Sequence, residues 1–206
     1  MTAPTSPITS LDELAGYIAA AYPSQVFTQV AWHELPNHLD EARLMALAER
    51  LLDAADVTVA VRPFDEHYER SWEVTVGPAA YPTFPDWAEL DGAARLALVE
   101  EAGEPATFWH LNLSVIAPAW SGHWSTWAEE EGTLTPAEPT APSSDAWAAR
   151  AAAVREALAG LGLRELAPAL LDEPVEWIID HGTMEGFEGF EPGVPPTVYS
   201  VLVSAA

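Results

Sequence analysis

The sequence predicts an α+β fold, in which helices pack against a mostly antiparallel sheet of about five strands. Three observations lead to this prediction. Apolar residues return at helical spacing in residues 39–55 and 145–159. Apolar and polar residues alternate, with many β-branched side chains, between residues 57 and 76. Residues 107–127 alternate over two longer stretches. We expect one α+β domain over residues 1–206, since a chain of this length can bury a large core.

Start and stop signals bound four expected helices. The first helix follows Ser10 and Glu13, which have the spacing of a capping box, and Tyr22-Pro23 should end it. The third helix should stop at Gly103, a C-cap glycine. Residues 25–32 fit a strand or a helix. The expected helices span Leu11 to about Ala21, roughly Leu39–Ala55, about Asp91–Glu101 and Asp145–Ala159.

The expected strands begin with an antiparallel pair. Val57–Val61 is the first strand of the pair, and Ser71–Val76 is the second, after a polar loop over Asp65–Arg70. The run Thr197–Ser204 is mainly apolar and predicts an interior strand that is covered on both faces. Residues 132–144 are rich in Pro, Thr and Ala and predict a long surface loop.

A tryptophan-rich hairpin is the most distinctive part of the predicted sheet. Residues 107–127 hold four of the nine tryptophans and two of the six histidines, and Pro118 marks a turn between two strands. Side chains alternate along a strand, and this alternation carries across a turn with an even number of residues; with such a turn, one face is an apolar core face and the other is polar. The core face carries Trp109, Leu111, Leu113, Val115, Trp120 and Trp124. The polar face carries His110, Asn112, Ser114, Ser121, His123 and Ser125.

The polar face is a possible site, made of His110, Asn112 and His123. A half-exposed strand face needs polar residues for structural reasons alone, and a binding surface or a catalytic site are the alternatives. A catalytic zinc ion needs a third protein ligand, and no local carboxylate falls on this face. No G-x-S-x-G motif occurs either. We therefore predict no catalytic residue, no metal ligand and no cofactor.

A second candidate site is the glycine-rich acidic segment Asp180–Gly193. It repeats a Glu-Gly-Phe triplet, and its two phenylalanines must be buried somewhere. They either pack back on the domain or contact a partner, where aromatic residues often dominate the binding energy. The predicted partner-binding residues are Glu185, Phe187, Glu188, Phe190 and Glu191.

The charge balance restricts the partners. There are 32 acidic residues against 8 basic ones, all arginine, for a net charge of -24, and the absence of lysine is typical of GC-rich bacterial genomes. Such a surface repels nucleic-acid phosphates and attracts basic proteins, although the charge also serves solubility alone. Without cysteine, no disulfide or thiolate site can form. No stretch approaches the ~20 apolar residues that span a bilayer, and MTAPTSPITS lacks signal-peptide features, so we expect a cytoplasmic protein without a membrane partner.

The segment His110–Trp127 and the terminal TVYSVLVS together resemble small bacterial α+β immunity proteins of polymorphic-toxin systems. The resemblance implies a protein that binds and blocks a cognate toxin without chemistry or cofactor. We expect a non-enzymatic acidic intracellular binding protein, such as an immunity or inhibitor protein for a basic partner. The alternatives are a metal-dependent hydrolase that uses His110 and His123, and a structural or stress-related protein.

Overall fold

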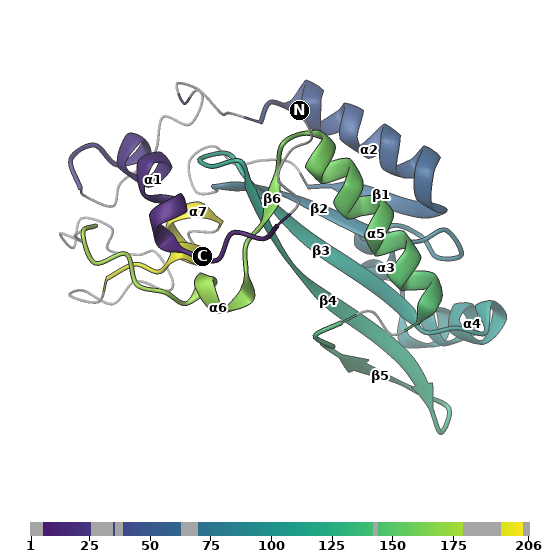
Figure 1. The fold of residues 1–206 in the computed structure, drawn as a ribbon. Helices are drawn as coiled ribbons and strands as arrows, with labels where there is room; N and C mark the ends of the chain where they lie inside the picture. Colours follow the sequence, from purple (N-terminus) through teal and green to yellow (C-terminus); the bar gives the residue numbers. More distant parts are fainter. Residues whose placement is uncertain are drawn as a thin grey trace.

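The structure is a computed structural model that describes residues 6–25, 35, 39–62, 70–141, 144–178 and 195–203. Its fold is α+β, as the sequence predicts. Five strands form an open antiparallel sheet in the order β1-β2-β3-β4-β5, and a short strand, β6, pairs in parallel with β4 (Figure 1). The strands are β1 (Val57–Val61), β2 (Ser71–Pro78), β3 (Ala106–Ser114), β4 (Ala119–Glu130), β5 (Thr133–Ala137) and β6 (Arg164–Glu165).

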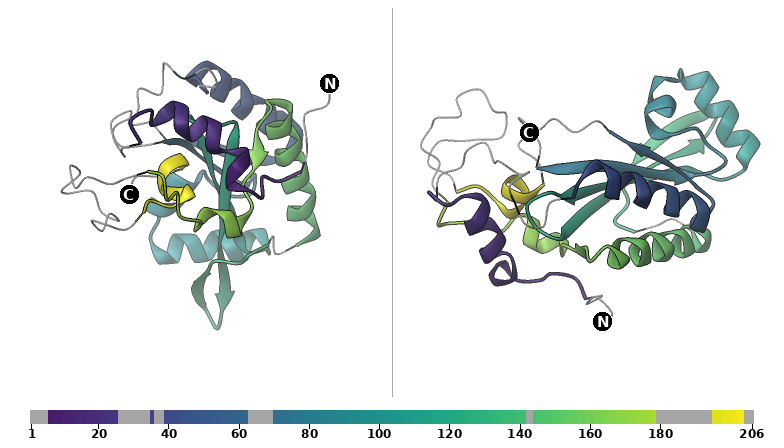
Figure 2. Two further views of the ribbon diagram at one scale, coloured as in Figure 1. Left: turned by 60° about the vertical axis from the view of Figure 1, so that its left-hand side comes forward. Right: turned by 90° about the horizontal axis from the view of Figure 1, so that it is seen from above.

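The helices gather in three groups around this sheet. Helices α2 and α5 lie over one face, α3 and α4 lie over the other, and α1, α6 and α7 cluster at one end (Figures 1 and 2). Among the described residues, no helix has the length and apolar character to cross a membrane. The helical elements are η1 (Leu11–Glu13), α1 (Ala15–Ala21), α2 (Glu41–Ala55), α3 (Phe84–Glu89), α4 (Gly92–Ala102), α5 (Asp145–Gly160), α6 (Pro168–Leu171) and α7 (Val198–Leu202).

All four predicted helices are present, and a side-chain cap starts each of them. Asp40, Asp91 and Ser144 accept main-chain N–H bonds at the first turns of α2, α4 and α5. Gly103, at φ 68°, ends α4 in the left-handed conformation that favours glycine. The first predicted helix begins as the 3₁₀ turn η1, where the Ser10 hydroxyl accepts from the Asp12 N–H at 3.2 Å and Glu13 accepts from the Thr9 N–H at 3.3 Å. Most of residues 25–32 and of the loop 65–70 lie outside the described residues.

The prediction of a C-terminal strand is wrong. Residues Val198–Leu202 form helix α7, with Thr197 as its N-cap accepting from the Ser200 N–H at 3.3 Å. Val198, Val201 and Leu202 are buried at helical spacing. An apolar run has no alternation that separates a buried strand from a buried helix, so the sequence pattern could not decide between them.

The prediction of a loop over residues 132–144 is also wrong in part, because residues Thr133–Ala137 form β5. Glu131 and Gly132 have φ values of 52° and 77°, and Glu130 pairs with Thr133. Two positive φ angles in a two-residue connection are typical of a tight β-hairpin turn, so Glu131-Gly132 folds β5 back onto β4. This hairpin projects from the body of the protein (Figure 2).

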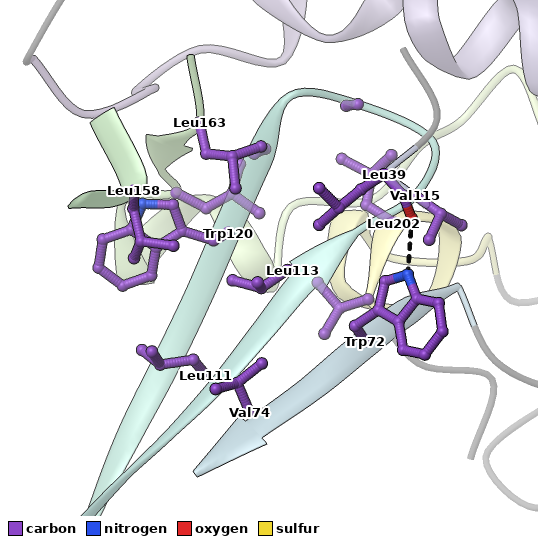
Figure 3. Close-up of a cluster of buried hydrophobic side chains, with 14 of the residues drawn as sticks. Leu39, Trp72, Val74, Leu111, Leu113, Val115, Trp120, Leu158, Leu163 and Leu202 are labelled. Carbon is purple, nitrogen blue, oxygen red and sulfur yellow. Dashed lines mark hydrogen bonds between the residues drawn. The ribbon is translucent and has the colours of Figure 1, made fainter. Parts of the chain in front are cut away.

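The main core lies on the apolar face of the sheet, under α2 and α5. Trp109 and Trp124 stack at 4.6 Å between ring centroids, and Trp147 of α5 meets Trp124 edge-on at 5.2 Å. In Figure 3, Trp72 Nε1 donates to the carbonyl of Leu39 at 2.8 Å, which ties β2 to the segment before α2. The same close-up shows Val74, Leu111, Leu113, Trp120 and Leu158 gathered around these strands.

A second, smaller core lies on the opposite face, beneath α3 and α4. Tyr81, Trp87, Val99, Ala106 and Phe108 are its buried members. The face that the alternation predicts as polar is therefore covered at this end by aromatic side chains. These aromatic side chains border the open part of the face, where the two histidines lie.

A candidate binding groove on the polar face

The two histidines of the predicted polar face lie side by side. His110 on β3 pairs directly with His123 on β4, and their rings stack at 4.8 Å with an angle of 16° between planes. The next pair along the same face joins Asn112 and Ser121. The sequence-derived parity is thus confirmed, because side chains at directly opposed positions share a face.

Hydrogen bonds hold the His110 ring on both sides. Its Nε2 lies 2.6 Å from the hydroxyl oxygen of Ser125, and its Nδ1 lies 3.3 Å from that of Thr75. A neutral imidazole donates from one nitrogen and accepts at the other, so one ring satisfies two hydroxyl partners. Phe84 of α3 meets the ring edge-on at 4.5 Å between centroids. His110 is therefore a fixed part of the site.

Burial sets the charge of His110. Desolvation, followed by the nearby charge of His123, lowers the pKa of His110 from 6.5 to about 4. The ring is neutral near pH 7 and is a weak base there, whereas general-base catalysis favours a pKa near the working pH. Within the described ranges, no cluster of three or more His, Cys, Asp or Glu side chains could hold a metal ion. Near neutral pH, His110 is therefore an uncharged hydrogen-bonding group on this face.

A groove of about 630 Å³ opens beside the histidine pair. Strand β5 and helix α3 supply its walls, and β3 and β4 supply its floor. Its lining residues are Phe84, His110, His123, Ser125, Trp127, Pro136, Ala137 and Glu138. A second groove of about 520 Å³ lies between α4 and β5, and it shares Trp127 and Pro136 with the first. Trp127 therefore lies between the two grooves.

The predicted site residues have different outcomes. The groove brings His110 and His123 together, whereas Asn112 is 8% exposed and is not among the groove's lining residues. The predicted partner-binding residues Glu185, Phe187, Glu188, Phe190 and Glu191 lie outside the described residues and stay a prediction.

Sequence reasoning missed Phe84, Trp127 and Glu138 as parts of the site. One signal pointed to the helix that carries Phe84: Thr83 and Asp86 have capping-box spacing, and the Thr83 hydroxyl donates to the Asp86 carboxylate at 2.6 Å. No local pattern marks Glu138, because only the return of β5 beside β4 brings it to the groove.

In comparisons with protein-family models, curated proteins and solved structures, nothing matches this chain. The groove residues and the charge of the surrounding surface are therefore the basis of the functional proposal.

Proposed function

We propose that this protein is a non-enzymatic binding protein for a basic protein partner. An immunity or inhibitor protein is the class favoured by the resemblance of His110–Trp127 and the terminal segment. The main support is the charge arrangement of the fold: its arginines largely serve internal contacts, and its carboxylates remain on the surface.

Among the described residues, contacts of this kind are made by Arg62, Arg70, Arg95, Arg150, Arg155 and Arg164. Arg70 is 4% exposed and donates to the Tyr22 hydroxyl at 2.7 Å, and Arg95 donates to the Trp87 carbonyl at 3.0 Å. The ion pairs are Arg62–Glu73, Arg150–Asp56, Arg155–Glu165 and Arg164–Glu13. With 32 acidic residues in the chain, these contacts leave a strongly negative surface field, which speeds encounter with a basic protein.

Part of this charge is concentrated at the end of the sheet that carries the groove. Ala106 pairs with Trp127, so Glu104 before β3 and Glu129 on β4 come to the same end. Glu129, Glu130 and Glu131 are exposed at the projecting β4–β5 hairpin (Figure 2). A basic partner that approaches this end would meet both the carboxylates and the groove.

The proposal is tested by retrieving the partner with the tagged full chain from its own organism's lysate, at low and at high salt. One stoichiometric basic protein, weakened at high salt, is the expected result, because screening shortens the reach of surface charges. The variant Glu130→Lys/Glu131→Lys should lose most of this protein. The control Glu41→Lys/Glu49→Lys makes the same charge change on the exposed side of α2 and should retain it. Retention of no basic protein at low salt would contradict the proposal.

A further inference from the structure

Trp127 is a rigid, half-buried ring at the boundary of both grooves. Phe84, Trp87 and Phe108 pack around it with ring centroids at 5.9, 6.0 and 5.9 Å. These contacts fix the orientation of the indole, and the remainder of its surface lines the hollows on either side of β5. A ligand that binds there would lose little free energy in ordering this side chain.

The fold already places arginines over three of its other tryptophans. The guanidinium carbons of Arg95, Arg150 and Arg155 lie 5.8, 5.5 and 4.8 Å from the ring centroids of Trp87, Trp147 and Trp109. In the described part of the chain, no arginine occupies that position over Trp127. Since a cation above an indole face is attracted by the ring quadrupole, Trp127 offers an outside ligand the contact that the other three make internally.

The charge of the 630 Å³ groove is also suited to a cation. Glu138 lies exposed at its rim, and none of the described lining residues is an arginine. His110 carries no charge near neutral pH, since burial lowers its pKa to about 4. The groove therefore combines an aromatic wall with a carboxylate, the pair of groups that a planar guanidinium contacts by stacking and by paired hydrogen bonds.

We propose that the groove between Trp127 and Glu138 is the binding site for an arginine side chain of the basic partner. The guanidinium lies against the Trp127 indole and points its N–H groups at the Glu138 carboxylate. This inference rests on the proposed function, because the arginine belongs to the partner protein. It adds the chemical class of residue that the partner must present.

The test uses a small probe and no partner. N-acetyl-arginine amide is titrated into the full-length protein while the tryptophan indole N–H signals are followed by NMR, with the Trp127 signal assigned from Trp127→Phe. We expect saturable shifts of the Trp127 signal with a dissociation constant in the millimolar range, as for other small fragments. N-acetyl-citrulline amide, the neutral isostere, should bind roughly tenfold more weakly, because it lacks the positive charge that the Trp127 ring and the Glu138 carboxylate attract.

Two variants separate the site from general charge attraction. Glu138→Gln keeps the shape of the rim and should weaken the arginine probe about fivefold, whereas Glu41→Gln on α2 should leave its affinity unchanged. The indole spectrum of Glu138→Gln without the probe shows whether the fold is intact. Equal binding of arginine and citrulline probes, or an intact Glu138→Gln that binds as the wild type does, would overturn the inference.

The two proposals fail separately. If the arginine probe binds Trp127 but no basic partner is retrieved, the site stands and the binding function does not. If a basic partner is retrieved but the probe leaves Trp127 unchanged, the partner contacts another surface, and the groove is not its arginine site.

Discussion

Two neighbouring pairs of the β3–β4 ladder stack in a similar way but receive different cover from the helices. Trp109 and Trp124 stack at 4.6 Å on one face, and His110 and His123 stack at 4.8 Å on the other, one position along the strands. Helix α5 closes over the tryptophan pair with Trp147, leaving Trp109 and Trp124 1% and 5% exposed.

On the other face, Phe84 of α3 packs against the His110 ring, whereas His123 remains exposed. The same local geometry thus produces a core on one face and a groove on the other. Strand pairing therefore places two side chains next to each other. The helices that pack over them determine whether the side chains are buried in the core or line a groove.

Trp109→Ala should have the largest effect on stability. It removes a buried ring from the stack with Trp124 and leaves a cavity, so the free energy of unfolding should fall by about 3–5 kcal/mol. His123→Ala, on the exposed side of the ladder, should cost less than about 0.5 kcal/mol. Urea denaturation of both variants measures the difference. Similar losses in the two would show that the faces are equally important for folding.

Gly122→Ala should destabilise the apolar face by about 1–3 kcal/mol through overpacking. An added Cβ would lie 2.8 Å from the His110 carbonyl oxygen and 2.9 Å from Trp109 Nε1, and the main-chain atom cannot move away cheaply. Gly16→Ala in α1 is the matched control, since nothing lies within 4 Å of its added Cβ. The control should be neutral or stabilised by about 0.5–1 kcal/mol, since alanine favours a helix over glycine. Thermal melts distinguish the two, and an unchanged Gly122→Ala would mean that the strands separate easily.

The polar face should make stability depend on pH. The unfolded His110 takes up a proton below about pH 6.5, whereas burial lowers its folded pKa to about 4. Because the unfolded state binds more protons between these values, the contribution of neutral His110 is present above pH 6.5 and is lost as pH falls toward 4. Between pH 7 and pH 4.5, wild type should lose roughly 2 kcal/mol more than His110→Asn in urea denaturation. Parallel losses in the two proteins would contradict the assigned pKa.

Smaller effects than that of His110 itself should come from the hydroxyls that hold its ring. Ser125→Ala removes the 2.6 Å partner of Nε2 and should cost about 1 kcal/mol, because water can partly replace a half-buried hydroxyl. Thr75→Val removes the longer 3.3 Å contact to Nδ1 and should cost about 0.5 kcal/mol. Urea denaturation gives the order of the two losses. A larger loss for Thr75→Val would assign the main anchoring hydrogen bond to Nδ1.

Much of this comparison was predictable from the residues themselves. The alternation in residues 107–127 predicted both faces of the hairpin and placed His110 and His123 on the same face, whereas only the strand register showed that the two rings stack. Helical spacing and caps predicted α2, α4 and α5 within a few residues. The errors fell where a local pattern fits two structures, as in the apolar run of α7, or where a tight turn lacks the usual Asn-Gly signal, as at Glu131-Gly132 before β5.

The sequence by itself determined the alternation of the strands, the excess of carboxylates over arginines and the absence of thiol chemistry, because each follows from residue type and local spacing. Only the tertiary structure showed that α5 covers Trp124 while His123 remains exposed, and that Phe84 and Glu138 line the same groove. The reason is physical: side-chain direction is a local property of a strand, whereas burial depends on elements distant in sequence that pack over it. The proposed arginine site exists at the edge of that packing.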